Sequence, residues 1–430
     1  MISKQHVQFS NYSHGAVSEV FNTQITATKL SHFFKEIMKK KINEITQLLT
    51  SRIISEIGLL SGICGQILTC NELFLQKKIS QEWLSHLHQV LEDRLANENF
   101  IATHCSGLAG IGWLYEYLSQ RKIMDYDTNI LLEEFDNYLE NELKRFMATN
   151  TYDFLHGGVG IVLYFTKRVA KKRELVSVLN QFLEDLEKNS IIHKDNTIKW
   201  KSYLGYPIPQ PGYNIALSHG MSAIVAILSK LNKIEGIHKE KIEILLQGVV
   251  QYVLAQEIDK DKYGSYFSSY ALESTPTIFK SRLAWCYGDL GIASALYQAG
   301  KTLKKESWMN KAQEIMLYAA TRRQNLAENL VQDAGLCHGT TGIGHIFYRM
   351  WWNTQLPEYK KAADYWFEQT LKMATFEDGL AGFKTLQMSE GKPVWVTDYG
   401  LLEGISGIGL ALLTYYYEIE PEWDECLLLS

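Results

Sequence analysis

Two short motifs in the second half of the chain carry the donor atoms of a metal site. Cys286 stands in a Trp-Cys-Tyr-Gly motif, and the adjacent pair Cys337 and His338 stands in a Cys-His-Gly motif. Two thiolates and one imidazole suit zinc, and three protein ligands leave a fourth position open for water or substrate. A lone cysteine or histidine before a helix is more often a cap or a packed residue. Three such groups in neighbouring repeats indicate one zinc ion per chain.

The two motifs belong to a signature that recurs seven times along the chain. It consists of a small or polar residue, a glycine, two further residues, usually a second glycine, and then an apolar residue. The first glycines are Gly62, Gly107, Gly157, Gly220, Gly288, Gly339 and Gly404. They lie 45 to 68 residues apart, which is enough for two helices with their loops. Each repeat therefore predicts a helical hairpin.

The hydrophobic pattern divides each hairpin into an inner and an outer helix. After the glycines the sequence is apolar at helical spacing, as in residues 292–297, 343–348 and 408–413, which predicts buried inner helices. Segments before the turns are amphipathic, as in residues 132–143, which predicts a solvated outer layer. Closed after about seven hairpins, these layers form an all-α fold, an α/α toroid, in one domain over residues 1–430. An open superhelix is the alternative, and it would need polar caps at its ends.

Two segments interrupt the helical pattern. Residues 190–214 mix alternating polarity with three prolines, which predicts an extended insertion with β character. Residues 262–279 are rich in Tyr, Ser and Thr, which predicts a loop near the site.

Residues at one offset from the repeated glycine should occupy equivalent places around one end of the ring. Directly before the first glycines stand Ser61, Ser106, His156, His219, Tyr287, His338 and Glu403. One place earlier stand Leu60, Cys105, Leu155, Ser218, Cys286, Cys337 and Leu402. Polar and titratable groups thus converge on one rim.

The other cysteines have ordinary roles in this interpretation. Six cysteines in a chain of this length are too few for a disulfide scaffold, so we expect free thiols. Cys105 shares the offset of the metal ligands, but its hairpin is the second, away from the fifth and sixth in a ring of seven, and we expect a buried thiol. Cys64, Cys70 and Cys426 lie at other offsets and are expected to be structural.

Composition excludes several other classes of protein. Hydrophobic residues make up 46% and charged residues 21%, which is typical of a globular chain with a large core. The net charge is −5 and no long Lys/Arg block is present, which argues against nucleic acid as a partner. The first residues lack a signal-peptide pattern and no apolar run has spanning length, which predicts a cytoplasmic protein.

The motifs at Leu217-Ser-His-Gly, Ala284-Trp-Cys-Tyr-Gly-Asp and Gly335-Leu-Cys-His-Gly-Thr together resemble those of the lanthipeptide (lantibiotic) cyclase family. The similarity extends over nearly the full length. It implies an α/α toroid with a smaller inserted extension, one zinc ion, and addition of cysteine thiols to dehydroalanine or dehydrobutyrine in a precursor peptide, closing lanthionine and methyllanthionine rings. By matching motif, the zinc ligands are Cys286, Cys337 and His338.

The resemblance also implies roles for four further residues. His219 matches the catalytic histidine of the family, Asp153 its acidic residue, and Arg282 and Tyr287 polar groups near the metal. His219 would protonate the enolate that forms after thiol addition, and it can first accept the thiol proton. Asp153 would orient that imidazole, although a helix-terminal cap is its simpler role. The family pattern does not demand His156, and its role stays open.

Partners implied by the resemblance are a dehydrated, leader-bearing precursor peptide, a dehydratase and an export transporter, which would bring the protein to the inner face of the membrane. Three other functions stay open. A related branch of the superfamily couples glutathione to dehydrated proteins. A prenyltransferase-like toroid would want a basic cluster for a diphosphate and usually an Asp ligand. A non-enzymatic binding module would hold a structural zinc, which normally has four protein ligands.

Overall fold

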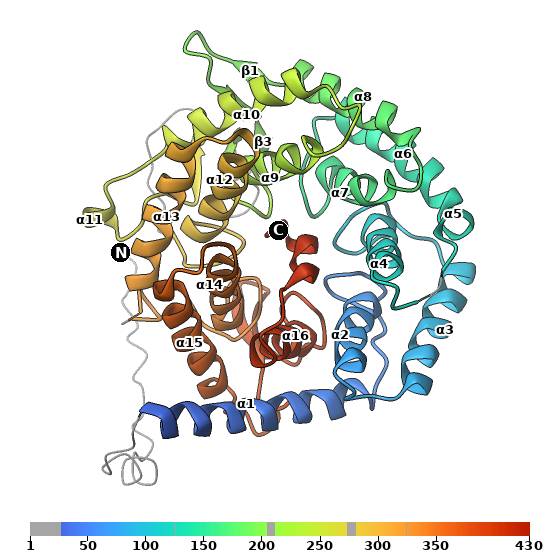
Figure 1. Cartoon of the computed structure of the whole chain (residues 1–430), viewed down its shortest axis with the longest axis vertical. Coiled ribbons are helices and arrows are strands. Elements are labelled where there is room, and N and C mark those ends of the chain that lie inside the picture. Colours follow the sequence, from blue (N-terminus) through green and yellow to red (C-terminus); the bar gives the residue numbers. More distant parts are fainter. Residues whose placement is uncertain (1–26, 125, 204–210, 273–280, 324) are drawn as a thin grey trace.

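The computed structural model describes residues 27–124, 126–203, 211–272, 281–323 and 325–430. Within these ranges seven inner helices surround the centre of the molecule (Figure 1). They are α2 (Ile63–Leu75), α4 (Leu108–Gln120), α7 (Gly158–Arg168), α9 (Met221–Leu231), α12 (Asp289–Leu303), α14 (Thr340–Thr354) and α16 (Ile405–Tyr416). The outer helices around them are α1 (Ala27–Leu49), α3 (Gln81–Asn97), α6 (Glu133–Ala148), α8 (Leu175–Lys188), α10 (Lys239–Leu254), α13 (Glu306–Thr321) and α15 (Pro357–Lys372).

The ring is closed. Each inner helix packs against the next, and the last of them, α16, packs against both α1 and α2 at the start of the chain (Figure 1). Leu402, ahead of α16, donates its backbone N–H to the Leu60 carbonyl at 2.8 Å. The α/α toroid of seven hairpins is confirmed, and the open superhelix is excluded.

Burial explains which helix of each hairpin faces inward. Helix α16 is buried without interruption from Ile405 to Tyr415, so an apolar residue is favoured at almost every position. Helix α8 buries only a stripe at helical spacing, formed by Leu175, Leu179, Phe182, Leu183 and Leu186. The outer helices thus expose one polar face, while the inner helices are covered on all sides.

The repeated glycine begins every inner helix, because the preceding loop folds back onto the first helical turn. A Cβ atom at Gly107 would lie 2.0 Å from the Ile101 carbonyl oxygen, and one at Gly220 would lie 2.2 Å from that of Asn214. Gly288 also has φ +94°, a conformation that side chains disfavour. Only glycine lets the loop approach its helix this closely.

Backbone hydrogen bonds join the loops of successive repeats at the offset two residues before the first glycine. The N–H to carbonyl pairs are Leu60 to Cys105 (3.0 Å), Cys105 to Leu155 (3.0 Å), Ser218 to Cys286 (3.3 Å), Cys286 to Cys337 (3.3 Å), Cys337 to Leu402 (3.0 Å) and Leu402 to Leu60 (2.8 Å). These bonds hold equivalent residues at one level around the ring. We call this end of the toroid the rim.

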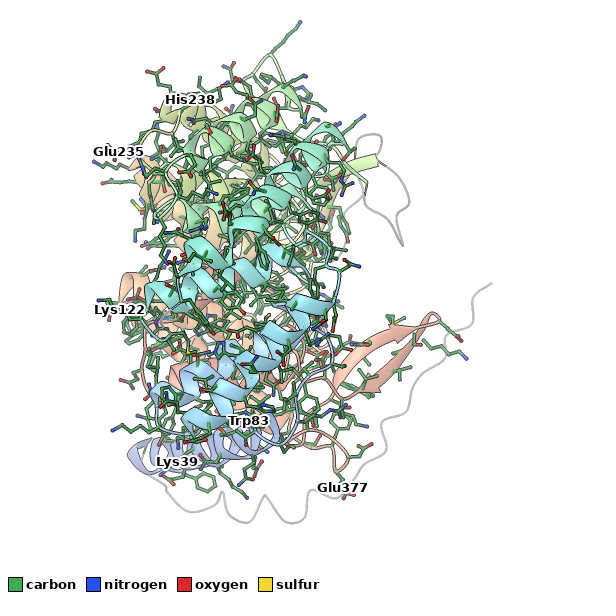
Figure 2. All side chains as sticks on the ribbon, turned by 90° about the vertical axis from the view of Figure 1, so that its right-hand side faces the viewer. Lys39, Trp83, Lys122, Glu235, His238 and Glu377 are labelled. Atoms are coloured by element: carbon green, nitrogen blue, oxygen red, sulfur yellow. The ribbon has the colours of Figure 1, made fainter. Side chains whose placement is uncertain are left out.

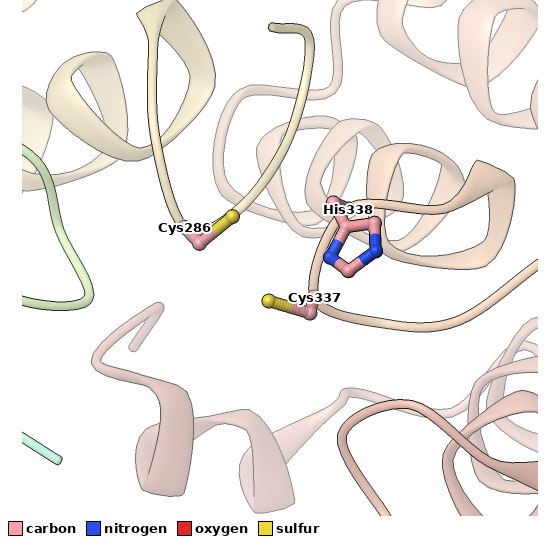
Figure 3. A group of neighbouring side chains, drawn as sticks. All are labelled: Cys286, Cys337 and His338. Carbon is pink, nitrogen blue, oxygen red and sulfur yellow. The ribbon is translucent and has the colours of Figure 1, made fainter. Parts of the chain in front are cut away.

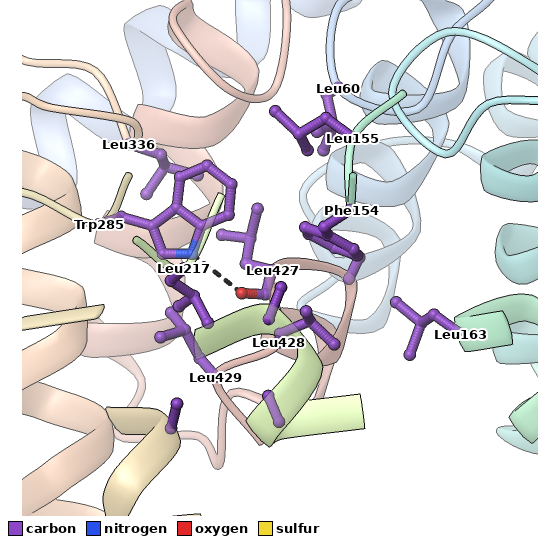
Figure 4. Packing of buried hydrophobic residues seen from close by; sticks show 14 of the residues in the cluster. Leu60, Phe154, Leu155, Leu163, Leu217, Trp285, Leu336, Leu427, Leu428 and Leu429 are labelled. Carbon is purple, nitrogen blue, oxygen red and sulfur yellow. Dashed lines mark hydrogen bonds between the residues drawn. The ribbon is translucent and has the colours of Figure 1, made fainter. Parts of the chain in front are cut away.

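The C-terminal segment fills the centre of the ring. The short 3₁₀ helix η2 (Glu422–Leu427) and the leucines after it lie among inner-helix loops, and Leu427 accepts a 2.9 Å hydrogen bond from the Trp285 indole (Figure 4). The Cys426 carbonyl is 2.9 Å from Nε2 of the buried His104. A ring of helices needs such a plug because side chains lining its centre would otherwise face a void.

Short strands form small antiparallel sheets beside the helices. Strand β1 (Ile191–Ile192) pairs with β2 (Ile198–Lys199), and β4 (Pro211–Asn214) lies between β3 (Ser202–Tyr203) and β5 (Tyr270–Leu272). The extended insertion is therefore confirmed where the structure describes it, and residues 204–210 lie outside that part. The loop expected at 262–279 contains the end of helix α11 (Lys260–Tyr263) and β5, and its residues 273–279 lie outside the described ranges.

A further strand pair was not predicted. Strands β6 (Thr385–Ser389) and β7 (Lys392–Val396) form a hairpin that stands out from the ring (Figure 2). None of the helices described is at once long enough and apolar enough for a bilayer crossing.

Candidate metal centre and acid–base pair

Three side chains from adjacent repeats meet at the rim. Cys286 precedes α12, Cys337 and His338 precede α14, and their ligand atoms all lie within 4.8 Å of one another (Figure 3). The backbone N–H groups of Trp285 and Cys286 both donate to the Cys337 carbonyl, at 3.1 and 3.3 Å. The rim hydrogen bonds thus bring the two loops together. We call Cys286, Cys337 and His338 the Cys2His cluster.

The cluster favours negative charge on one of its two sulfurs, that of Cys286. A hydrogen bond from Cys337 holds the pKa of Cys286 well below the usual thiol range, although burial opposes this, and His338 and Arg282 lower it further. The same contact keeps the pKa of Cys337 well above that range. Burial acts to lower the pKa of His338, but its interactions with Asp333, Cys286 and Glu403 outweigh burial and raise that pKa to about 10.

Two carboxylates flank the histidine of the cluster. Oδ2 of Asp333 lies 3.6 Å from His338 Nε2, and Oε1 of Glu403 lies 3.7 Å from His338 Nδ1. Asp333 is itself fixed, because its two oxygens accept hydrogen bonds from the backbone N–H groups of Gly335 (3.1 Å) and Leu386 (3.2 Å). Burial raises the pKa of Glu403 to about 7. A metal-bound imidazole keeps one N–H, and the carboxylate that accepts it orients the ring.

The donor set fits zinc. Asp333, His338 and Glu403 also form a group with ligand atoms within 4.8 Å, but it shares His338 with the Cys2His cluster, so both groups describe one centre. Two soft sulfur donors beside a nitrogen donor favour zinc over calcium or magnesium. The sequence analysis placed Glu403 on the rim without a role and did not name Asp333. Asp333 could have been found from its offset, because it stands six residues before the first glycine of its repeat, as Arg282 does in the preceding repeat.

A second polar group lies on the rim at the third and fourth repeats. His219 Nδ1 donates to Asp153 Oδ2 at 2.7 Å, and Asp153 Oδ1 accepts the backbone N–H of His156 at 2.8 Å. Burial acts to lower the pKa of His219, but the hydrogen bond and charge of Asp153 prevail, so the net shift is upward. The carboxylate is a cap for its own loop as well as the partner of His219. We call these two residues the Asp153–His219 pair.

The pair lies next to the Cys2His cluster. Ser218, which precedes His219, donates from both its N–H (3.3 Å) and its hydroxyl (3.1 Å) to the Cys286 carbonyl. The ring of Tyr287 has its centroid 6.1 Å from that of His219. Burial raises the pKa of Tyr287, which therefore stays a neutral phenol.

A cavity of about 500 Å³ opens beside the pair. Its lining includes Asp153, Trp200, Asn214, His219 and Tyr287. The strands of the insertion supply one wall, so the extended segment borders the rim.

The remaining predicted residues take the following places. Half-buried Arg282 lies in the same loop as Cys286, and its charge acts on that thiol. The ring of His156 stacks on that of His219 at 5.9 Å, and burial lowers its pKa. Cys64, Cys70 and Cys426 are buried free thiols.

Cys105 corrects one expectation. Its side chain is half-buried rather than buried, because it lies among polar groups of the rim, with a hydrogen bond to Ser106 and the charges of Asp153 and Glu403 acting on it. Burial still raises the pKa of Cys105. Within the described residues it joins no group of possible metal ligands.

Comparisons with known proteins agree with this architecture. The family model described as lanthionine synthetase C-like protein matches residues 53–428. The Nisin biosynthesis protein NisC of Lactococcus lactis subsp. lactis is 24% identical over 402 residues, covering 87% of this chain and 89% of that protein. The solved structure of a nisin cyclase aligns with a TM-score of 0.67 at 20% identity, covering 94% of this chain and 98% of the other, which shows the toroid fold.

Proposed function

Since the chain belongs to the lanthionine synthetase C-like family, we propose that it is a zinc-dependent lanthipeptide cyclase that closes thioether rings in a dehydrated precursor peptide. The observation that carries this proposal is the Cys2His cluster beside the Asp153–His219 pair on one rim. A sulfur-rich metal centre next to a proton donor suits the addition of a thiol to an activated alkene.

Cys286, Cys337 and His338 would hold the zinc ion. With the metal on Nδ1 of His338, Asp333 would accept the Nε2–H and orient the ring, and Glu403 would lie on the metal side of it. Zinc, when bound, would lower the pKa of a substrate thiol so that it is a thiolate at neutral pH. The other groups on the rim would position the peptide and handle protons.

The reaction moves one proton and needs no co-substrate. The substrate sulfur bonds to the β-carbon of dehydroalanine or dehydrobutyrine, and the π electrons shift to the α-carbon and its carbonyl as an enolate. His219 accepts the thiol proton and returns it to the α-carbon, so the peptide keeps its mass. Asp153 holds His219 through Nδ1, which leaves Nε2 to exchange that proton. Tyr287 is a second neutral donor, and Arg282 places positive charge near the reacting sulfur.

Other features follow from the same proposal. The whole ring would work as one domain, because every repeat contributes to the rim. The substrate would arrive from a dehydratase and leave through an export transporter, with the protein in the cytoplasm at the inner face of the membrane.

The test uses purified protein, zinc and a verified, dehydrated, leader-bearing peptide without ATP. Thiol alkylation followed by mass spectrometry should report loss of free thiols at unchanged peptide mass. A parallel reaction with glutathione distinguishes the related activity, since coupling of glutathione adds mass. Full alkylation of every peptide thiol after incubation, equal to a sample without protein, would refute the proposed function.

A further inference from the structure

The β6–β7 hairpin presents apolar side chains to solvent. Met388 is 69% exposed, Val394 41% and Trp395 38%. The hairpin stands away from the helices (Figure 2), and a two-stranded hairpin by itself is only marginally stable in water. Large apolar groups gathered on such an element mark an interaction surface.

The register shows which edge of the hairpin can accept another strand. Glu390 and Gly391 form a two-residue turn with φ of 50° and 77°, the type I′ geometry. The cross-strand pairs are Ser389 with Lys392, Met388 with Pro393, Gln387 with Val394, Leu386 with Trp395 and Thr385 with Val396. With this turn, the pair next to the loop is hydrogen-bonded and the pairs alternate from there. The N–H and carbonyl of Leu386 and Met388 therefore point to the outer edge of β6.

One hydrogen bond and one proline agree with this assignment. Leu386 donates its N–H outward to Asp333 Oδ2 at 3.2 Å. On the opposite edge, Pro393 occupies an outward position on β7 and offers no N–H, a common device that prevents strand pairing. Pro393 therefore interrupts the outward amides of β7 and leaves that of Trp395, whereas β6 offers the outward N–H of Met388 and the outward carbonyls of Leu386 and Met388, the Leu386 N–H being already bound to Asp333. What favours β6 over β7 is its position beside the candidate metal centre.

The edge of β6 begins beside the candidate metal centre. Asp333, which accepts the Leu386 N–H, lies 3.6 Å from His338 Nε2. Thr385 donates its hydroxyl to the Glu403 carbonyl at 2.8 Å. An extended chain advances about 3.3 Å per residue, so a peptide whose cysteine lies at the cluster would reach Met388 within about five residues.

We infer that the outer edge of β6 binds the precursor peptide as an added strand, through the segment next to the reacting cysteine. This inference rests on the proposed function. Strand pairing uses main-chain groups, so it does not depend on the side chains of the peptide. One edge can therefore bind segments next to cysteines in different sequences. Leu386, Met388 and Trp395 share one face and would contact alternate side chains of the peptide.

Two variants test the added strand. Met388→Pro removes the outward N–H and leaves the hydrogen bonds of the hairpin intact, because Met388 is at a non-hydrogen-bonded position. Met388→Leu is the matched control. We expect Met388→Pro to raise KM for ring closure about tenfold with kcat within about twofold, as for a lost binding contact, and Met388→Leu to behave as wild type. Trp395→Glu leaves the backbone unchanged and should also raise KM. It keeps the inference testable if the Met388→Pro variant does not fold.

Direct binding separates this inference from the proposed function. Peptide affinity is measured by fluorescence anisotropy with a dehydrated peptide whose thiols are alkylated, so that no ring can close. Wild-type protein that binds but closes no rings contradicts the proposed function and leaves the hairpin site standing. Wild-type affinity and KM in both Met388→Pro and Trp395→Glu overturn the hairpin site. So does a change of oligomeric state without a change in KM, because the edge would then pair with a second copy.

Discussion

The Cys2His cluster and the Asp153–His219 pair lie on one rim and arise from one repeated turn, yet they differ in accessibility. Cys286 is 5% exposed and the His338 side chain 20%, and backbone hydrogen bonds tie the Cys286 loop to the next repeat. The side chains of His219 and Asp153 are 29% and 24% exposed and border a cavity. A metal ligand needs fixed geometry, whereas a group that exchanges protons with substrate must be reached by it.

The two histidines also differ in the number of carboxylates beside them. His338 lies between two carboxylates, and His219 has one. Equivalent backbone positions therefore acquire different chemistry from neighbours contributed by other repeats. Five substitutions separate the two groups, beginning with the largest expected effect.

Cys286→Ala should abolish stoichiometric zinc binding and reduce ring closure to the rate without protein, since two ligands cannot hold the ion against dialysis. Cys105→Ala is the matched control, because Cys105 occupies the same offset without joining the cluster. Metal analysis and thiol alkylation of the peptide report both properties. Full zinc content in Cys286→Ala would show that the cluster is not the metal site.

His219→Ala should keep zinc and peptide binding but slow single-turnover ring closure by about 10²- to 10⁴-fold, the usual loss for an acid–base group. The alternative is that His219 only packs against its loop, in which case the variant would lose stability while folded molecules react normally. Zinc content, melting temperature and rate on one preparation distinguish the two. Near wild-type turnover would leave Tyr287 as the proton donor.

Asp333→Asn should weaken zinc binding by about 10- to 100-fold, because the amide orients His338 less firmly than a carboxylate. The two oxygens of Asp333 each accept one backbone hydrogen bond, from Gly335 and from Leu386. Asparagine has one acceptor oxygen and can keep only one of these two hydrogen bonds. Competition with a chromogenic chelator measures the affinity. The rate with saturating zinc should stay closer to wild type than in His219→Ala, and an unchanged affinity would rule out the orienting role.

The sequence predicted the ring and the rim because both depend on a local requirement. The loop folds onto the helix start so closely that glycine is needed, and the requirement recurs at the first glycine of every repeat, as at Gly107 and Gly220. Once the rim hydrogen bonds align the loops, the offset alone brings Cys286 to Cys337. The repeat pattern therefore predicted which residues, far apart in the sequence, lie close together in space.

Features without a local signal were missed. Asp333 and Glu403 act through their distance to His338, and a carboxylate before a turn is equally typical of a cap. The apolar C-terminal segment could pack anywhere, and only the closed ring shows that it fills the centre. The β6–β7 hairpin did have a signal, a Glu-Gly turn between alternating residues, within a region dominated by helices.

Asp153→Asn should move the alkaline limb of the pH–rate profile to lower pH. Burial disfavours the imidazolium of His219, and Asp153 raises its pKa above the usual value near 6.5. Without the carboxylate that pKa falls, and each unit lost reduces the imidazolium fraction about tenfold above the pKa. Single-turnover rates between about pH 5.5 and 9 test this. A profile with an unshifted alkaline limb would mean that another group sets it.

The raised pKa of His219 also makes the stability of the folded protein depend on pH. A group whose folded pKa is raised contributes stability that is complete below its unfolded pKa and is lost as pH rises through the folded pKa. The difference in melting temperature between wild type and Asp153→Asn should therefore be larger near pH 6 than at higher pH, in protein with zinc present.

His156→Asn should have the smallest effect, with ring closure within about threefold of wild type, although the His156 ring stacks on that of His219 at 5.9 Å. The hydrogen bond from residue 156 to Asp153 comes from its backbone N–H, which asparagine keeps, so the carboxylate stays aimed at His219. Burial lowers the pKa of His156, so at neutral pH it adds no charge beside the pair. Single-turnover rates of His156→Asn and His219→Ala at equal zinc content make the comparison. A loss of 10²-fold or more in His156→Asn, with zinc and melting temperature unchanged, would place both imidazoles in the proton transfer and make the acid–base group a pair of histidines.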